Sequence, residues 1–469
     1  MTRRTYEDVP AHPVKSFFVH MLTRDISVSD AILDLLDNCV DGIIRKTKGK
    51  RSGTTPYKGY KAQIDIGKDS FSIHDNCGGI PWNLHEYAFR MGRAKADQDA
   101  GLPVVGTYGI GMKRAIFKIG KSCLIQTQNG KDAYDVELSP SWMKDENQWT
   151  IPVEAAKTRM KEDGTTIVIE KLNKGVSELF GDNAKSFRRD FEAQVASHYA
   201  FIISKGFSVE VNGRPVSPLP TKLAFEKSNK TKAIRPFVYT THTNGVDVFM
   251  AVGFTRPIPS EEEIAAEQVE ARYSTLDAGW TVVCNDRAVL YCDRTELTGW
   301  GEAGVPKYHT QFIAISGVVE FRSNDASRLP TTTTKRGIDA ASPLYLQVKN
   351  KMREGMALFT NYTNKWKGRE LVQQARAQID SAAPAGIEEI KQRVAKLRLT
   401  HVKSRLRGRQ YKPTLPMPSH TAGDTRRISY SKPLGEVEQV SDYLFDDDGQ
   451  TPSVVGERCF DEILKEAKQ

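Results

Sequence analysis

Short polar side chains recur at helical spacing in residues 26–48. Side chains three or four residues apart share one face of an α-helix. They therefore form one polar face, and Ile32, Leu35 and Cys39 form an apolar face on the far side. Within this segment no cation precedes Arg45, and like charges at this spacing repel one another. The polar face consists of four carboxylates and one amide: Asp30, Asp34, Asp37, Asn38 and Asp41.

Two interpretations of this polar face are open from the residues alone. It is either a solvated acidic surface, or a site where a divalent cation or a polarised water offsets the repulsion. Magnesium suits short oxygen ligands and keeps several of its waters, so one side-chain oxygen together with phosphate oxygens suffices to hold it. We favour the second interpretation, because solvated helix faces usually mix both signs of charge.

Two glycine-rich stretches that follow suit the binding of a nucleotide. Residues 75–80 come after a predicted strand; Gly78 and Gly79 let the backbone approach a flat ligand, and Asp75 can accept a hydrogen bond from an adenine amino group. Residues 106–111 have the spacing G-x-x-G-x-G and run into a predicted helix, whose N-terminus offers free amides to phosphate. A plain turn and a mobile connector have similar sequences, so neither stretch is decisive alone.

In this order the segments resemble the nucleotide-binding motifs of GHKL ATPases, the superfamily of gyrase B, MutL, MORC proteins and the large heat-shock chaperones. The resemblance covers residues 15–180 and is closest in character to MORC-like bacterial ATPases, some of which sit in phage-defence operons. The matching segments are 34–41 (the N-box), 75–79 (the D-x-G-x-G box), 106–111 (the lid glycine box) and 164–165 (the last ATP-contacting motif).

The resemblance implies ATP and Mg²⁺ as cofactors and a role for each matching position. Asp34 takes the place of the general base, which orients and deprotonates the attacking water. Asn38 is expected to coordinate magnesium, and Asp75, helped by Thr165, is expected to read the adenine amino group. The other expected nucleotide contacts are Gly79 (room for the base), Gly106, Gly109 and Gly111 (the phosphates) and Asp41 (support of the pocket).

Two positions depart from the family pattern. The general base is usually Glu, and Asp34 is one methylene shorter. Because reach decides whether a base works, we expect slow or partner-stimulated turnover, or a site that binds ATP as a sensor. Cys77 replaces the usual first glycine of the D-x-G-x-G box, with Gly78 beside it, and this alters the shape of the loop.

Periodicity and turn signals place these motifs in an α/β protein. The expected fold is a GHKL (Bergerat) α/β sandwich, then an α/β domain that resembles the ribosomal-protein-like transducer domain, then a helical, basic C-terminal region. The first domain is expected to contain a helix at 26–48, a hairpin at 61–66 and 70–74, a helix at 112–119 and a strand at 165–170. The second is expected to contain helices at 187–204 and 342–366, a hairpin at 207–216, and strands at 246–254, 280–290 and 311–321.

Composition shifts divide the chain further. The predicted domains are 1–180 (ATP-binding), 181–366 (transducer-like), 367–412 (helical basic connector), 413–432 (Pro-rich linker) and 433–469 (small helical segment). Lys335 is the expected second catalytic residue, because residues 331–337 resemble the MutL stretch that reaches a cation to the γ-phosphate; Arg336 is the second choice. A solvated basic loop is the alternative.

The segment 391–412 carries nine Lys or Arg and no acid. Each such cation can neutralise a phosphate, so DNA or RNA is a candidate partner. A solvated basic helix, or a dock for an acidic partner, is the alternative. The candidate contacts are Arg393, Lys396, Arg398, Lys403, Arg405, Arg407 and Arg409.

The GHKL resemblance also implies an ATP-dependent homodimer. A rival hypothesis is a chaperone-like or scaffolding module that binds a protein partner through apolar residues of its C-terminal segment, such as Phe445, Phe460 and Ile463. The chain is 39% hydrophobic and 27% charged with a net charge of +9, and its six cysteines form no paired motif. No apolar run reaches the about 20 residues of a membrane span. We therefore expect a cytoplasmic protein with no membrane partner.

Overall fold

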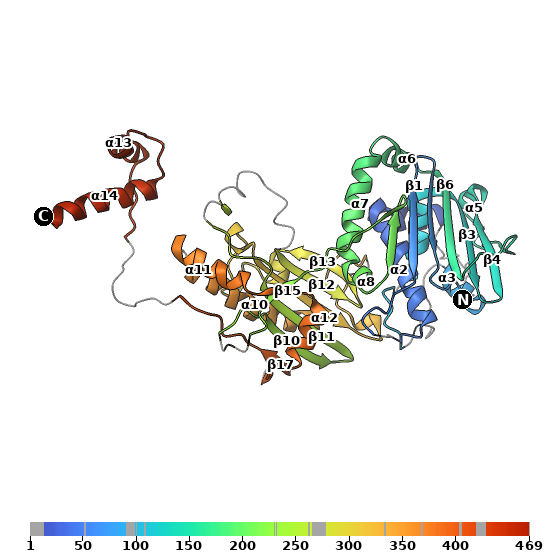
Figure 1. The fold of residues 1–469 in the computed structure, drawn as a ribbon. Helices are drawn as coiled ribbons and strands as arrows, with labels where there is room; N and C mark the ends of the chain where they lie inside the picture. Colours follow the sequence, from blue (N-terminus) through green and yellow to red (C-terminus); the bar gives the residue numbers. More distant parts are fainter. Residues whose placement is uncertain are drawn as a thin grey trace, which may run out of the picture. The chain divides into compact units, whose positions relative to one another are not determined.

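The computed structural model describes residues 14–50, 53–90, 99, 101–106, 109–228, 230, 232–260, 263–264, 278–332, 334–366, 369–402, 406–418 and 428–468. The chain divides into two compact units, Met1–Met417 and Pro418–Gln469. The larger unit contains two extended sheets, and the described part of the smaller unit consists of helices and their connections (Figure 1).

The first extended sheet is mixed. Its neighbouring strands are antiparallel except β1 and β7, which run parallel. In spatial order the strands are β5 (Val153–Ala155), β4 (Asp132–Leu138), β3 (Gly120–Asn129), β6 (Gly164–Leu172), β2 (Ser70–Asp75), β1 (Lys61–Ile66), β7 (Ser208–Val211) and β8 (Arg214–Pro215). The accompanying helices are α1 (Lys15–Arg24), α2 (Val28–Lys46), η1 (Trp82–Leu84), α3 (His85–Phe89), α4 (Gly111–Ile119), α5 (Pro140–Lys144), α6 (Lys174–Gly181), α7 (Ala184–His198) and α8 (Ala200–Ser204).

Helix α2 carries the polar face, and Ser27 caps its N-terminus. The Ser27 hydroxyl accepts a hydrogen bond of 3.0 Å from the Asp30 amide and so satisfies one of the free donors of the first turn. The apolar residues Ile32 and Leu36 are fully buried. Helix α2 packs on α4, which in turn contacts β3 and β6. This packing fixes the polar face of α2 relative to the sheet.

The elements predicted for the ATP-binding domain are confirmed to within a few residues as α2, β1, β2, α4 and β6. The first sheet, however, runs past residue 180, where the sequence places the domain limit. After α7 and α8 the chain adds β7 in parallel to β1, with Ser208 opposite Lys61. Asn212 and Gly213 form the predicted hairpin turn between β7 and β8, both with positive φ. The domain limits themselves stay predictions.

The second extended sheet is also mixed. Its strands in spatial order are β13 (Arg287–Asp293), β12 (Gly279–Cys284), β14 (Ile315–Arg322), β11 (Val246–Phe254), β10 (Phe237–Thr243), β17 (Gly408–Tyr411) and β16 (Thr400–Val402), and a small separate pair is β9 (Leu223–Phe225) with β15 (Ala383–Ala385). The associated helices are η4 (Glu296–Thr298), η5 (Thr310–Phe312), η6 (Ala326–Arg328), α10 (Pro343–Lys365), α11 (Arg369–Asp380) and α12 (Ile387–Val394).

Long helix α10 packs against β10, β11 and β14 of this sheet. A Cβ added to Gly355 would lie 2.5 Å from Val252 Cγ1, so glycine permits the close approach. The predicted helix at 342–366 and strand at 246–254 are confirmed as α10 and β11. The single strand predicted at 280–290 is wrong: the segment is a hairpin, β12 and β13, which turns at Asn285 and Asp286. The resemblance to a transducer domain stays a prediction.

The prediction of a helical connector at 367–412 is wrong in its basic half. Helices α11 and α12 are present, but β16 and β17 follow and continue the second sheet beyond β10. Strand pairing decides this outcome: Val238 pairs with Tyr411, and Leu406 is buried. Tertiary context therefore overrides the local helical preference of the basic residues.

The smaller unit contains α13 (Leu434–Phe445) and α14 (Pro452–Ala467), which contact each other. The helical character predicted for residues 433–469 is thus confirmed. Large apolar side chains remain exposed on this unit, among them Tyr443 (86%), Leu434 (69%) and Ile463 (63%). Among the helices that the structure describes in the whole chain, none combines the length and apolar character required to cross a membrane.

Candidate functional site

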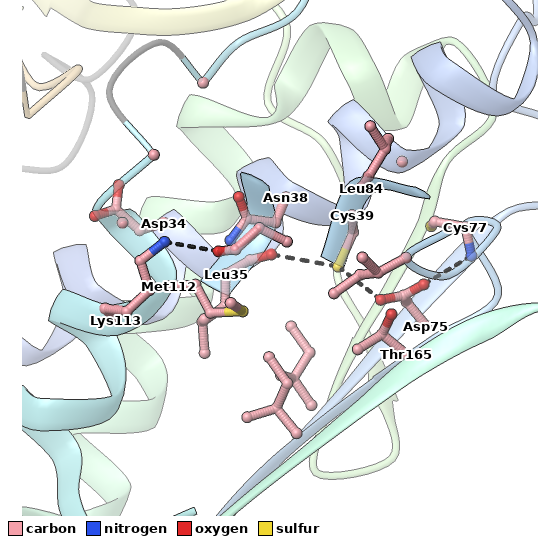
Figure 2. Close-up of a pocket in the computed structure, with 18 of the residues that line it drawn as sticks. Asp34, Leu35, Asn38, Cys39, Asp75, Cys77, Leu84, Met112, Lys113 and Thr165 are labelled. Atoms are coloured by element: carbon pink, nitrogen blue, oxygen red, sulfur yellow. Dashed lines mark hydrogen bonds between the residues drawn. The ribbon is translucent and has the colours of Figure 1, made fainter. Parts of the chain in front are cut away.

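One pocket gathers almost all the residues that the sequence nominates for nucleotide binding and catalysis. It lies between α2, the loop after β2, the glycine box, α4 and β6, and its lining includes Asp34, Asn38, Asp75 and Thr165 (Figure 2). Lys335 of the second domain also lines it. Of the residues nominated for these two roles, Asp41 is the one that does not line the pocket. The nominated residues that do are Asp34, Asn38, Asp75, Gly79, Gly106, Gly109, Gly111, Thr165 and Lys335.

Asp75 lies at the end of the pocket where the adenine is expected. Its Oδ1 accepts a hydrogen bond of 2.7 Å from the Cys77 amide, and Cys39 Sγ lies 3.5 Å from its Oδ2 (Figure 2). Burial raises the pKa of this carboxyl, and the Cys77 amide opposes the rise. Thr165 pairs with Asp75 across β2 and β6, so the two expected adenine contacts lie side by side.

The apolar walls beside Asp75 suit a flat base. Leu84, Ile80 and Ile167 line this part of the pocket together with Met112. A site with apolar walls and a single directional acceptor favours an aromatic ligand that carries a donor. This end of the pocket can therefore distinguish an amino group from a carbonyl at the same position of a purine.

Gly79 is required by the protein backbone itself. Its φ is +66°, and an added Cβ would lie 2.0 Å from the carbonyl oxygen of Gln128. The expected role, room for the base, is therefore secondary to the close approach of β3. Gly164 is equally constrained, because its Cβ would lie 1.9 Å from the carbonyl oxygen of Asp75.

The acidic face of α2 is buried, so its interpretation as a solvated surface is wrong. Asp34, Asp37 and Asp41 are each no more than 5% exposed. Asp41 accepts hydrogen bonds from the amides of Val105 (2.6 Å) and Gly106 (2.9 Å). It thus anchors the start of the glycine box from behind, and it supports the pocket without lining it.

Asp37 holds the second domain against α2. Its carboxylate accepts hydrogen bonds from Tyr199 Oη (2.5 Å), Arg287 Nε (3.0 Å) and Lys335 Nζ (2.8 Å). Burial alone would raise the pKa of Asp37, but Lys335 and Arg287 outweigh burial, and the pKa falls below its usual value. Asp37 is therefore a buried carboxylate with a structural role. It lies where α2 of the first sheet meets β13 and the loop of Lys335.

Asp34 is the carboxylate that faces the phosphate end of the pocket. Its Oδ2 accepts a hydrogen bond of 2.5 Å from Arg114, and Lys335 Nζ lies 4.0 Å from its Oδ1. Burial raises the pKa of Asp34 above its usual value, and Lys335 and Arg114 oppose that rise. A raised pKa is the direction that a carboxylate needs in order to accept a proton from water near neutral pH.

Asn38 is the exposed member of the polar face, and it fits the expected magnesium contact. It lines the pocket, and its side-chain amide makes no hydrogen bond with the described residues. No cluster of three or more His, Cys, Asp or Glu suited to a metal occurs in the described part of the chain. A magnesium ion here would thus need Asn38, water and phosphate oxygens together.

Lys335 and Arg336 have different surroundings, and these separate the two candidates for the γ-phosphate cation. Lys335 reaches the pocket from the second domain with φ at 55°, which is uncommon for a non-glycine residue. Arg336 instead binds Asp30, Gln194 and His198 outside the pocket. The geometry therefore favours Lys335, although its catalytic role stays a prediction.

Several residues of the site gave no signal in the sequence. Arg114 follows the glycine box but was not nominated, and Tyr199 and Arg287 are distant in the chain from Asp37. In the β12–β13 turn, Asn285 donates a hydrogen bond of 3.0 Å to the Val104 carbonyl, directly before the glycine box. No local periodicity marks such a turn, because its buried partners lie in another domain.

Comparison with known families now identifies this site. The family model described as histidine kinase-, DNA gyrase B- and HSP90-like ATPase matches residues 26–168. Residues 26–168 form a GHKL-type ATPase domain. The match contains α2, β2, the glycine box and Thr165, which are the elements that build the pocket. A comparison with curated proteins gave no match.

The basic segment of the chain lies outside the GHKL domain, on and beside α12, β16 and β17. Arg393 is paired with Glu389, whereas Lys396, Arg398, Arg407 and Arg409 are exposed. Two further candidates, Lys403 and Arg405, lie outside the described residues. All six cysteines are free.

Replacing Gly106 by Ala is expected to weaken ATP binding to the GHKL domain by about tenfold. The new Cβ would lie 2.7 Å from Asp41 Oδ2, so the anchor between α2 and the glycine box must shift, at a cost of about 1.4 kcal/mol for a tenfold change. Calorimetric titration with ATP measures the effect. Gly175→Ala is the matched control, since nothing lies within 4 Å of its Cβ; equal affinities of the two variants would contradict the role of the anchor.

His198 is expected to make the chain less stable as the pH falls from about 7.5 to about 5. Its Nδ1 donates to the Ala288 carbonyl and its Nε2 accepts from Arg336. Burial, with Arg287 and Arg336, lowers the pKa of His198 from 6.5 to about 3. The unfolded chain binds a proton in this range and the native chain does not, which destabilises the fold by about 2 kcal/mol at pH 5. Urea unfolding of wild type and His198→Gln measures it; identical pH profiles would contradict the assignment.

Proposed function

We propose that this chain is a magnesium-dependent ATPase that acts as an ATP-gated homodimeric switch on nucleic acid, or with a partner that acts on it. The observation that carries the proposal is the position of Lys335. This residue comes from the second domain, lines the nucleotide pocket and contacts Asp37 and Asp34 of the GHKL domain. A change in the charge of the pocket therefore acts directly on the second domain.

Different residues of the pocket serve nucleotide binding and hydrolysis. Asp75 accepts a hydrogen bond from the adenine amino group, and the amides at the start of α4 and in the glycine box face the phosphates. Magnesium, when held by Asn38 and phosphate oxygens, would neutralise charge on the phosphates. Asp34 orients the attacking water and accepts its proton. Arg114 holds Asp34 in place through their 2.5 Å contact.

Contacts between the domains provide a path from the pocket to the second sheet. Asn285, Asp286 and Arg287 are consecutive and almost fully buried. Asn285 contacts the backbone before the glycine box, Asp286 accepts hydrogen bonds from Tyr57 and Lys205 (each 2.8 Å), and Arg287 binds Asp37. Movement of the glycine box on ATP binding would thus displace the β12–β13 turn. This coupling is what a switch requires.

Nucleic acid is the proposed client because the exposed cations of the basic segment lie on and beside β16 and β17, which belong to the same sheet as β12 and β13. The homodimer, the MORC-like character and the phage-defence association rest on the family resemblance alone and stay predictions. Retention of labelled DNA and RNA on a filter at low salt tests the client. Absence of any retention would remove nucleic acid from the proposal and would leave the ATPase intact.

A second candidate function is an ATP sensor that binds a protein partner with little turnover. Two observations favour it: Asp34 is short and tied to Arg114, and the C-terminal unit exposes Tyr443, Leu434 and Ile463. Deletion of residues 418–469 separates the two functions. The sensor loses recruitment of its partner, whereas the nucleic-acid switch keeps its nucleic-acid binding.

Light scattering of the full chain tests the switch itself. We expect the molar mass to double with a non-hydrolysable ATP analogue and magnesium, and to stay monomeric with ADP. Asn38→Ala is expected to stay monomeric with the analogue, because it lacks the expected magnesium contact. A mass that does not depend on the nucleotide would overturn the gating part of the proposal.

A further inference from the structure

A groove crosses one face of the second sheet beside β16 and β17, and it shares no residue with the nucleotide pocket. A cross-strand row forms its floor. His401 lies opposite Arg409, Arg409 opposite Thr240, and Thr240 opposite Phe249. Residues directly opposite on antiparallel strands project from the same face, and all four line the groove. Figure 1 shows β10, β11, β17 and α12 close together in this part of the larger unit.

Glu320 and Asp247 are the acids of the groove, and both have partners within it. Glu320 binds Lys391 and, at 3.0 Å, Arg322, which offset its negative charge. His242 Nδ1 lies 2.7 Å from Asp247 Oδ1. Arg407, directly before β17, and Arg409 of β17 are the further cations that a ligand meets in the groove.

Arg407 and Arg409 are the cations that remain available. Both line the groove and are exposed, and within the described residues neither side chain has an ion pair or a hydrogen bond. The segment 391–412 contains no acid. Two guanidinium groups two residues apart, one directly before β17 and one on it, can bind successive phosphates of a chain.

Local packing fixes the two arginines in place. Gly408 lies between them, and its Cβ would be 2.5 Å from the Thr240 carbonyl oxygen and 2.7 Å from Tyr239 Oη. Tyr239 Oη also donates a hydrogen bond of 3.0 Å to the Leu406 carbonyl. Contacts of β10 with Leu406 and Gly408 thus hold the backbone on both sides of Arg407, and strand pairing with Thr240 holds Arg409.

An apolar cavity adjoins the cationic half of the groove. Its own lining is apolar, namely Val394, Ala395, Leu397 and Leu399, and it shares Phe249 and the polar residues Thr240, Lys391, His401 and Arg409 with the groove. A ligand that fills both halves must carry anionic groups on one side and apolar flat faces on the other. Single-stranded nucleic acid has this arrangement, whereas a duplex keeps its bases stacked inside and presents phosphates and sugars.

We propose that this groove binds single-stranded nucleic acid, with phosphates on Arg407 and Arg409 and bases against Phe249 and the apolar cavity. The inference deepens the nucleic-acid part of the proposed function, on which it rests, and it names the site and the form of the ligand. The proposed contacts involve only phosphates and bases, so DNA and RNA strands share the required chemistry.

Fluorescence anisotropy with the full chain tests the groove. The probes are labelled oligo-dT and oligo-rU of about 20 nucleotides and a duplex of equal length, a span sufficient for a groove of this kind. We expect each single strand to bind at least about tenfold more tightly than the duplex at low salt. The dT and rU arms show whether DNA or RNA is preferred.

The double variant Arg407→Gln/Arg409→Gln is expected to weaken single-strand binding at least about tenfold. Loss of two phosphate contacts is also expected to reduce the slope of log affinity against log salt by about 1.4, at about 0.7 per contact. Lys174→Gln/Lys185→Gln is the matched control, because both lysines are exposed, on α6 and α7, and neither lines the groove. It removes the same charge and is expected to leave affinity within about twofold, because a lysine outside the groove neutralises no phosphate of the bound strand.

The outcomes distinguish failure of the groove proposal from failure of the nucleic-acid switch. If the groove double variant binds single strands like wild type, or if the duplex binds as tightly as the single strands, the groove proposal is overturned and the nucleic-acid switch survives. If no probe binds, both nucleic-acid statements are lost. ATP binding, measured on the same preparations, then shows whether the ATPase part stands by itself.

Discussion

Asp34→Ala is expected to lower the rate of ATP hydrolysis by about 10²–10⁴-fold, the usual contribution of a general base, while ATP still binds. Asp34 and Asp75 are the two carboxylates that line the pocket among the described residues. Asp75 is engaged by the Cys77 amide at the adenine end, so Asp34 is the acid available to a water at the phosphate end. Phosphate release at steady state with magnesium measures turnover, and calorimetry measures binding.

Two further variants distinguish loss of the general base from loss of structure. Asp34→Ala leaves Arg114 buried without its anion, which also costs stability; Asp34→Asn keeps an oxygen for Arg114 and is expected to be equally slow. Asp65→Ala, on an exposed position of β1, is expected to turn over like wild type. Hydrolysis by Asp34→Asn at the wild-type rate would place the base elsewhere.

Arg287→Met is expected to lower the free energy of unfolding by about 3–5 kcal/mol, the usual cost of removing one partner of a buried ion pair. Arg287 and Asp37 are each 2% exposed at the side chain and 3.0 Å apart. Without Arg287, Asp37 keeps Lys335 and Tyr199 but loses one of its two cations. Urea denaturation measures the change.

An exposed ion pair provides the matched control for this variant. Arg189 and Asp190 are separated by 3.1 Å, but their side chains are 75% and 58% exposed. Arg189→Met is therefore expected to cost less than about 1 kcal/mol. A double-mutant cycle of Arg287→Met with Asp37→Asn should show coupling, because the two side chains are in direct contact. A loss below about 1 kcal/mol for Arg287→Met would contradict the assigned contact.

Sequence patterns were sufficient for the elements whose signals are local. The spacing of Asp34, Asn38 and Asp41 predicts the polar face of α2, and the glycines at 106–111 predict the loop before α4. These features follow from helical periodicity and from backbone freedom, which act over a few residues. They were enough to predict most of the residues that line the pocket, because the motifs of this domain are themselves short segments.

Where the structure differs from the sequence-based predictions, the cause is pairing between residues that are distant in the chain. The sequence of α2 alone predicts a polar face that is either solvated or metal-bound. In the structure, Asp37 is instead neutralised by Arg287 and Lys335, which lie far along the chain. The basic segment reads as a helix, yet β17 joins the edge of β10 because Tyr411 and Arg409 pair with it. Such partners are chosen by the tertiary fold, and neither charge pattern nor propensity specifies them.

The pocket between α2, the glycine box and β6 is expected to bind ATP through Asp75. Calorimetric titration of wild type with ATP, and separately with GTP, tests it most directly. We expect saturable binding of ATP with magnesium and much weaker binding of GTP, because guanine carries a carbonyl where Asp75 needs an amino donor. Failure of ATP to bind, or equal binding of the two nucleotides, would contradict the assignment of this site.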